Sequence, residues 1–289
     1  MKVSGFTIVR NAIKFDYPIV EAITSFLFIC DEVIVAVGKS DDHTLDLIKS
    51  IDSEKIKIVE TVWNDTLREG GYVLADETNK AFAAISPDSD WAFYIQGDEV
   101  IHEKDLPAIK AAMLQYKDDK AVEGLLFNYN HFYGSYDFVG DTRQWYRKEI
   151  RIVRNDKNIS SYRDAQGFRK NGNKLNVKAI DASIFHYGWV KPPEAQQAKQ
   201  QTFHKLWHTD EWMKQNIPDV DQFDYDTIDS LAYFTGTHPR VMQNRINRMN
   251  WKFSFDPTQK KVSFKVKLLL FVEKKMGWKI GEYKNYNII

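Results

Sequence analysis

The fold of this 289-residue chain is decided by the stretch Asp90-Trp91-Ala92-Phe93-Tyr94-Ile95-Gln96-Gly97-Asp98-Glu99. Its first half, Trp91 to Ile95, is a short apolar run typical of a strand buried on both faces. The strand is expected to end at Gly97, where two carboxylates follow. This order places negative charge at the carboxyl edge of a sheet, where open α/β folds bind their ligands. Adjacent acids repel each other there unless a cation or a donor-rich ligand lies between them, and a divalent ion carrying a diphosphate would relieve the repulsion.

The first 130 residues alternate between strand-like and helix-like patterns. The expected strands are Val3–Val9, Glu32–Val37, Lys55–Val62, Trp91–Ile95 and Gly124–Tyr129. The expected helices are Pro18–Ile29, Thr44–Ile51, Gly71–Ile85 and Lys104–Tyr116. This order predicts an α/β, Rossmann-like fold: a mostly parallel sheet with helices on both faces and right-handed crossovers.

The remaining residues change character after about residue 190. Two further strands are expected at Ile150–Arg154 and Val177–Tyr187. The last part of the chain should be helical, with segments at Glu194–Asn216, Tyr225–Phe234, Pro239–Asn250 and Ser263–Met276. We therefore expect a main domain at 1–190 and a helical C-terminal extension at 191–289 that packs on it.

The composition excludes several classes of protein. Lys plus Arg number 40 and Asp plus Glu number 40, so the formal net charge is zero, which argues against a nucleic-acid binder. The single cysteine, Cys30, lies in an apolar run, cannot form an intramolecular disulfide, and is expected to be a buried thiol. We see no signal peptide at Met1 and no apolar stretch near the roughly 20 residues that span a bilayer, so we expect a cytoplasmic protein.

The turns after the expected strands offer groups that suit a nucleotide. Val9-Arg10-Asn11 follows the first strand, residues 37–44 follow the second, and Gln96-Gly97-Asp98 follows the fourth. Parallel strands share one carboxyl edge, so an amide, hydroxyls, cations and carboxylates should gather in one crevice. No G-x-G-x-x-G follows the first strand, which argues against a dinucleotide-binding fold.

Three segments together give a resemblance to a known family. They are Asp31-Glu32-Val33-Ile34-Val35-Ala36-Val37-Gly38-Lys39-Ser40-Asp41-Asp42-His43-Thr44-Leu45, Asp90-Trp91 through Asp98-Glu99, and Phe185-His186-Tyr187-Gly188-Trp189. They resemble the second-strand motif, the segment holding the D-x-D motif, and a later segment whose His can complete a metal site, in family-2-type glycosyltransferases of the GT-A fold. The resemblance runs to about residue 190, and Gly236-Thr237-His238-Pro239 is similar to a bacterial subgroup.

The resemblance implies a GT-A nucleotide-sugar-binding and catalytic domain at 1–190. The activity would be that of a hexosyltransferase-like enzyme of polysaccharide biosynthesis, which moves a sugar from a nucleoside-diphosphate sugar to a hydroxyl of a saccharide or lipid-linked saccharide, by single displacement with inversion. A divalent cation (Mn²⁺ or Mg²⁺) or basic side chains would stabilise the departing diphosphate. Asp98 and His186 would be the metal ligands. The expected donor contacts are Val9, Arg10, Asn11, Asp42, Gly71, Asn79, Gln96 and Gly97.

Two residues depart from the family pattern. Val37 stands where the motif has an Asp for the base, and Gln96 stands where D-x-D has its first acid. Gln96 can bind a ribose hydroxyl but is a poor metal ligand, so the metal requirement stays open. Simpler interpretations also stay open: Asp98 as a helix cap, His186 as a core histidine, and Asp42 as the cap of the following helix.

The acceptor hydroxyl needs a carboxylate base within hydrogen-bond reach. The family often carries its base after the fifth strand, where Asp164 is the only acid of residues 161–168, so Asp164 is our catalytic candidate. Asp141 and Glu149 are alternatives. Four further aromatic residues are candidates for an acceptor platform, with packing under a loop as the alternative interpretation: Tyr129, His131, Tyr133 and Trp145.

Residues 260–275 are both basic and apolar. As a helix they could lie on an anionic membrane at its inner face, although a terminal helix packed on the core is the more common arrangement. Two other functions stay open. A nucleotidyltransferase shares a similar sheet but would want glycines after Val9, and a non-catalytic descendant of the fold would bind a sugar or a partner.

Overall fold

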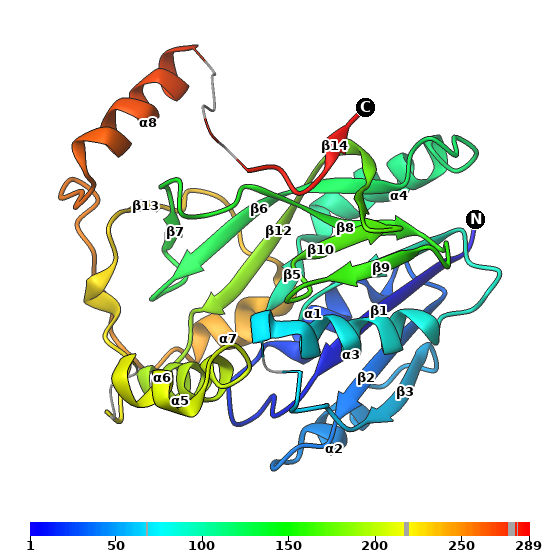
Figure 1. The fold of residues 1–289 in the computed structure, drawn as a ribbon, viewed down its shortest axis with the longest axis horizontal. Helices are drawn as coiled ribbons and strands as arrows, with labels where there is room; N and C mark the ends of the chain where they lie inside the picture. The colour runs from blue at the N-terminus through cyan, green and yellow to red at the C-terminus, as the bar shows by residue number, and fades with distance from the viewer. Residues whose placement is uncertain (68, 217–219, 277–280, 282) are drawn as a thin grey trace.

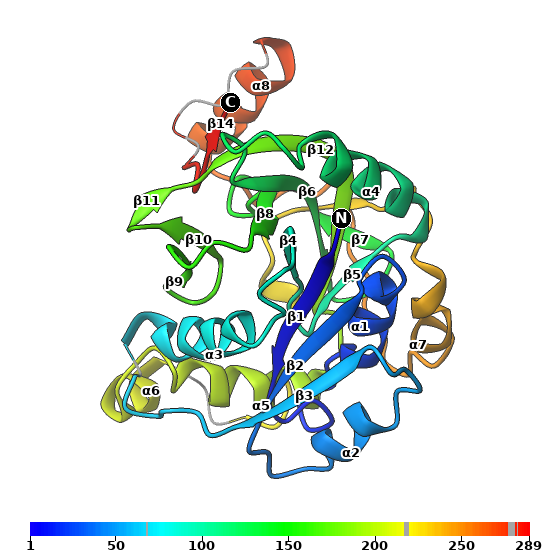
Figure 2. The same ribbon diagram turned by 90° about the vertical axis from the view of Figure 1, so that its right-hand side faces the viewer.

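The computed structural model describes residues 1–67, 69–216, 220–276, 281 and 283–289. Its centre is a block of parallel strands in the order β3-β2-β1-β4 (Figures 1 and 2). These strands are β1 (Val3–Val9), β2 (Glu32–Gly38), β3 (Ile56–Thr61) and β4 (Trp91–Tyr94). Every residue of β1, β2 and β4 is buried, as the continuous apolar runs predict for strands covered on both faces.

Helices cover both faces of this block (Figure 2). The first face is covered by α1 (Ile19–Leu27), α2 (Thr44–Lys49) and α4 (Leu106–Gln115), which share one apolar cluster. The other face is covered by α3 (Tyr72–Ala83), whose buried Val73 and Phe82 belong to a second cluster. The predicted α/β class, with a mostly parallel sheet between helices, is confirmed.

Beyond β4 the sheet becomes mixed. β8 (Lys148–Arg154) pairs antiparallel with β4, β6 (Gly124–Tyr133) antiparallel with β8, and the long β12 (Asn176–Trp189) parallel with β6. A short strand that the sequence pattern did not reveal, β5 (Glu99–Ile101), pairs antiparallel with β12. The register sets His186 of β12 between Glu99 on one side and His131 on the other. This pairing brings the end of β4 next to β12.

Smaller elements surround this sheet. β7 (Phe138–Gly140) continues it beyond β6, β14 (Asn287–Ile288) pairs with β12, and β9 (Ile159–Tyr162), β10 (Gly167–Lys170) and β11 (Asn173–Lys174) form a separate small sheet.

The C-terminal part differs from the expectation in two places. The expected helix at Tyr225–Phe234 is wrong: Tyr225–Thr227 is a 3₁₀ turn, and Leu231–Tyr233 forms β13, which pairs antiparallel with β7. Tertiary pairing overrides a local pattern there. The expected helix at Glu194–Asn216 is two helices, α5 (Pro193–His204) and α6 (Asp210–Asn216), and the two lie at the carboxyl edge of the parallel strands (Figure 1).

Two further helices follow. At Pro239–Asn250 a 3₁₀ turn (Arg240–Met242) precedes the short α7 (Gln243–Asn247). The helix α8 (Phe264–Met276) stands at the periphery in both views (Figures 1 and 2). Across the described residues, every helix is too short or too polar to cross a bilayer. The division of the chain at residue 190 stays a prediction.

Candidate functional site

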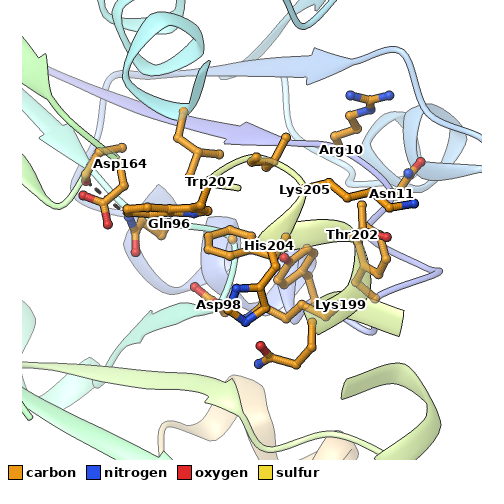
Figure 3. A pocket seen from close by; sticks show the side chains of 18 of the residues that line it. Arg10, Asn11, Gln96, Asp98, Asp164, Lys199, Thr202, His204, Lys205 and Trp207 are labelled. Atoms are coloured by element: carbon orange, nitrogen blue, oxygen red, sulfur yellow. Dashed lines mark hydrogen bonds and ion pairs between the residues drawn. The ribbon is translucent and has the colours of Figure 1, made fainter. Parts of the chain in front are cut away.

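A large pocket lies at the carboxyl edge of the parallel strands, and we call it the edge pocket. Its volume is about 1300 Å³, which is ample for a nucleotide sugar. Its walls come from the ends of β1 and β4, from β6 and β12, from the 164–166 turn, and from α5 and α6, which close it on the outer side. Figure 3 shows Asp164 and Gln96 on one side of it, and Arg10 and Asn11 on the opposite side. The lining residues used below are Val9, Arg10, Asn11, Trp63, Gln96, Gly97, Asp98, His131, Trp145, Asp164, His186, Lys199 and Trp207.

Asp98 lies at the centre of the polar groups in this pocket. Its Oδ2 is 3.1 Å from Lys199 Nζ and 3.7 Å from His186 Nε2. Its side chain is only 12% exposed. Burial alone would raise the pKa of Asp98, but the Lys199 ammonium and the His186 imidazole outweigh it and hold the pKa well below its usual value. Asp98 is therefore a carboxylate at neutral pH, and the expected neighbourhood of Asp98 and His186 exists.

A second histidine backs His186. The Nδ1 atoms of His131 and His186 are 3.2 Å apart, and His131 Nε2 lies 2.8 Å from the carbonyl oxygen of Tyr146. Burial, together with the neighbouring imidazole, lowers the pKa of His131 well below its usual value. His131 is therefore neutral at pH 7, so it adds a hydrogen-bonding group to the pocket and no charge.

Glu99, in contrast, is buried in the core and forms an ion pair there. Its carboxylate takes two hydrogen bonds from Arg151, at 2.7 Å and 2.5 Å, and one from the Tyr129 hydroxyl. Both Glu99 and Arg151 are 0% exposed. The repulsion expected between the adjacent acids is thus relieved for Glu99 by a buried guanidinium. The same carboxylate accepts a hydrogen bond from the backbone N–H of Gln96, so this ion pair fixes the turn that carries Asp98.

The side chain of Gln96 contacts the turn that carries Asp164. Gln96 donates from Nε2 to the carbonyl oxygen of Ala165 at 3.2 Å, next to Asp164. Burial raises the pKa of Asp164, which favours the uptake of a proton. Asp141 and Glu149, the alternative bases, do not line the edge pocket. Asp141 pairs with Lys260, and Glu149 lies in a smaller cavity of about 310 Å³ behind the 164–166 turn.

The turn after β1 is rigid. Asn11 is 3% exposed, has φ of 55°, and accepts a hydrogen bond from the backbone N–H of Asp41 at 2.7 Å. Asparagine tolerates this left-handed backbone better than most residues. Arg10 pairs with Asp65 at 3.3 Å and lies 5.5 Å from the ring of Trp63. Arg10 and Trp63 thus form a cation and an aromatic face beside the end of β1.

Three of the expected donor contacts do not line the edge pocket: Asp42, Gly71 and Asn79. Asp42 lies one residue before the N-cap of α2, which is His43, and accepts hydrogen bonds from the backbone N–H groups of Lys14 and of Thr44, the first residue of α2. Asn79 accepts a hydrogen bond from Ser161 N at 2.7 Å.

Gly71 supports the pocket from behind. Its φ is +70°, and a Cβ there would lie 2.8 Å from Trp207 Cζ2 and 2.9 Å from Asp164 Cβ. A glycine is required at this position both by the left-handed backbone and by the close approach of two residues that do line the pocket.

Sequence reasoning missed Lys199, Trp63 and Trp207. Lys199 and Trp207 lie in and just after α5, a polar helix whose sequence gives no sign that it folds over the sheet edge. Trp63 follows β3 directly, and its position after an expected strand was a usable signal.

Several buried polar atoms in the pocket wall lack a hydrogen-bond partner within the described part of the chain. They are Arg10 Nε, Trp63 Nε1, Trp145 Nε1, Asp164 Oδ1 and Trp207 Nε1. Buried polar groups are normally satisfied, and a cluster of unsatisfied ones needs an explanation. Trp63 Nε1 and Trp145 Nε1 pack against the backbone at Gly38 and Gly140, where an added Cβ would lie 2.3 Å from each, so these two atoms do not face the pocket.

The donor set does not fit a divalent cation in this arrangement. Gln96 offers an amide that already bonds to Ala165, and the Asp98 oxygen that faces His186 also holds the Lys199 ammonium. Over the described ranges, no three His, Cys, Asp or Glu side chains gather closely enough to hold a metal ion. A Mg²⁺ site that binds substrate phosphates normally draws one or two carboxylates from the protein, and here the carboxylate of Asp98 already holds an ammonium.

Comparisons with known proteins give distant structural likenesses and no family. No protein-family model matches the chain, and no curated protein matches it. The crystal structure of Staphylococcus aureus TarS 1–349 aligns with a TM-score of 0.40 and 16% identity over 70% of this chain, which spans 64% of that one.

Two other solved structures align over shorter parts. Glucosyl-3-phosphoglycerate synthase from Mycobacterium tuberculosis, in complex with Mn²⁺, UDP and phosphoglyceric acid, has a TM-score of 0.30 and 17% identity over 46% of this chain and 43% of its own. The 4-diphosphocytidyl-2C-methyl-D-erythritol synthase from Anaerococcus prevotii has a TM-score of 0.34 and 13% identity over 53% of this chain and 70% of its own. Such low scores carry no argument about function, which has to rest on the edge pocket itself.

Proposed function

We propose that the protein is a glycosyltransferase that binds a nucleoside-diphosphate sugar in the edge pocket and transfers the sugar to an acceptor hydroxyl. The observation that carries this proposal is the gathering of Asp98, Lys199 and Asp164 on the walls of one large pocket at the carboxyl edge of the parallel strands. Ligands of α/β folds bind at this edge. The resemblance of the Asp90–Glu99 segment to the D-x-D region of family-2-type glycosyltransferases supports the same assignment.

The two sides of the pocket suit the two halves of a displacement. The nucleotide would lie on the side of Arg10 and Trp63, where an aromatic face and a cation are available to it. Asp164 lies on the opposite side (Figure 3). A base and a leaving group on opposite sides of the anomeric carbon are what a single displacement with inversion requires.

The reaction follows from these positions. The acceptor oxygen forms a bond to the anomeric carbon while the bond from that carbon to the phosphate oxygen breaks. The diphosphate leaves with the bonding electron pair, and Asp164 takes the proton of the acceptor hydroxyl. The raised pKa of Asp164 brings the base closer to the pH at which it has to accept that proton.

The divalent cation expected from the sequence stays a prediction and enters no step here. If one binds together with the donor phosphates, Asp98 and His186 are the residues that would hold it, and it would supply positive charge to the leaving group.

Membrane contact through residues 260–275 also remains a proposal. Leu268 and Phe271 of α8 are 52% and 59% exposed, and Lys265 and Lys267 lie on the same helix. Such a helix would place a lipid-linked acceptor near the enzyme. Co-sedimentation with anionic and with neutral vesicles tests this, since only the anionic vesicles should retain the protein.

A thermal-shift panel tests the proposed function. UDP, GDP, CDP and ADP, the matching triphosphates and a set of nucleotide sugars are added singly. A diphosphate or its sugar at roughly a hundredfold excess over Kd should raise the melting temperature by about 5–10 °C. A response to triphosphates alone would instead indicate a nucleotidyltransferase, and no response to any nucleotide would indicate a non-catalytic descendant of the fold.

A further inference from the structure

Lys199 occupies the place next to Asp98 where a cation is expected. It extends from α5 into the edge pocket, and its side chain is only 12% exposed (Figure 3). Its Nζ is 3.1 Å from Asp98 Oδ2 and 3.0 Å from the carbonyl oxygen of Gly188, and it lies 5.2 Å from the ring of Tyr17. These contacts fix a long and normally flexible side chain in one position.

Among the described residues, the hydrogen bonds of this ammonium leave one donor for a ligand. A lysine ammonium has three N–H donors. Two are directed at Asp98 and at the carbonyl oxygen of Gly188. The pocket side of Lys199 therefore offers the third N–H to a phosphate oxygen that enters the edge pocket.

The charges around Asp98 are consistent with Lys199 taking the place of a divalent ion. In the D-x-D pattern that this segment resembles, two carboxylates face a divalent ion, which balances to zero. Here Gln96 stands in place of the first carboxylate, and Asp98 pairs with the Lys199 ammonium at 3.1 Å, while the charge of Lys191 also acts on Asp98. The position beside Asp98 that a divalent ion would take is therefore occupied by a cation of this chain.

We propose that the Lys199 ammonium, held by Asp98, binds the diphosphate of the donor by donating a hydrogen bond to a phosphate oxygen, so that donor binding needs no divalent cation. This inference rests on the proposed function, because it names the group that receives the leaving diphosphate. Lys199 donates to a phosphate oxygen in the bound complex and stabilises the negative charge that grows on the diphosphate as the bond to the sugar breaks.

Calorimetric titration tests the inference, using the nucleoside diphosphate that gives the largest shift among UDP, GDP, CDP and ADP. Each titration is run in EDTA and again in Mn²⁺. The wild-type protein should bind with Kd values within about threefold of each other in the two buffers. Lys199→Met, which keeps an unbranched side chain and removes the charged group, should weaken binding in EDTA by about 10- to 100-fold.

Mn²⁺ should recover part of the affinity of Lys199→Met, because the variant frees the Asp98 carboxylate beside His186 for a metal. The matched control is Lys110→Met, which removes an equal charge from an exposed position on α4 and should bind like the wild type. If Lys199→Met fails to fold, the double variant Asp98→Asn/Lys199→Met removes the stranded carboxylate with the ammonium. The double variant should fold and show the same loss of nucleoside diphosphate affinity in EDTA, and Mn²⁺ should not restore this affinity.

Two results would overturn the inference while leaving the proposed function intact: wild-type binding that disappears in EDTA, or Lys199→Met binding as tightly as the wild type in EDTA. A wild-type protein that binds none of the nucleoside diphosphates in either buffer would instead overturn the proposed function, and the inference with it.

Discussion

Replacing Glu99 by glutamine removes the charge that holds the Asp98 turn in place. Glu99 and Arg151 are both fully buried and joined by two hydrogen bonds, at 2.7 Å and 2.5 Å. Glutamine would turn an amide NH₂ toward the guanidinium donors and leave Arg151 without a counter-charge. Breaking a buried ion pair in this way costs about 3–5 kcal/mol of the free energy of unfolding. For a chain of this size, that corresponds to a fall in melting temperature of roughly 6–20 °C.

Thermal unfolding followed by circular dichroism measures this loss. Asp76→Asn is the matched control, because Asp76 pairs with Lys80 on α3 at 2.8 Å with both side chains 39% exposed. Such a surface pair contributes about 0–1 kcal/mol. Glu99→Gln should also bind nucleoside diphosphates more weakly than the wild type, since Glu99 accepts a hydrogen bond from Gln96 N in the same turn. A Glu99→Gln melting temperature equal to that of Asp76→Asn would refute the role assigned to this ion pair.

The remaining predictions concern the base, a buried acid and a glycine. Asp164→Asn should lower kcat by about 10²–10⁴-fold with little change in nucleoside diphosphate affinity, measured by transfer assay and calorimetry; unaltered kcat excludes Asp164 as the base. Burial raises the pKa of Glu149 to about 8 from 4.5, so the folded protein keeps a proton that the unfolded chain loses, and stability should fall as pH rises between these values. The melting temperature of Glu149→Gln should therefore exceed that of the wild type near pH 8 and equal it near pH 4.5. A difference in melting temperature that does not change with pH would contradict this. In Gly188→Ala, the added methyl would lie 2.7 Å from Asp98 Oδ2 and 2.5 Å from His186 Nε2, so calorimetry should show weaker binding of nucleoside diphosphates; wild-type affinity would show that these groups can move aside.

The sequence was sufficient to predict the parallel part of the sheet. The apolar runs of β1, β2 and β4 admit few arrangements other than strands covered on both faces, and the turns that follow them had to share one edge. Arg10, Asn11, Gln96 and Asp98 were placed in one crevice on that basis, whereas His186 was added through the resemblance to the family. The structure brings all five into the edge pocket together with Asp164.

The parts that could not be predicted depend on contacts between distant segments. The sequence pattern indicates that Glu99 is a second acid of the site beside Asp98. Only the pairing of β4 with β8 shows that Arg151, on β8, lies within reach of Glu99. Lys199 lies 101 residues from Asp98 along the chain, on a helix whose pattern is that of an ordinary surface helix. The strand β13 is three residues long, and its conformation is set by its partner β7.

A crystal structure of the protein with the nucleoside diphosphate that gives the largest thermal shift, prepared without divalent cations, tests the central claim most directly. The account predicts that the diphosphate lies in the edge pocket, with a phosphate oxygen within hydrogen-bond distance of Lys199 Nζ. The end of the diphosphate to which the sugar would be attached faces Asp164. A nucleotide bound elsewhere on the molecule, or an empty edge pocket at a saturating concentration of this nucleotide, would contradict it.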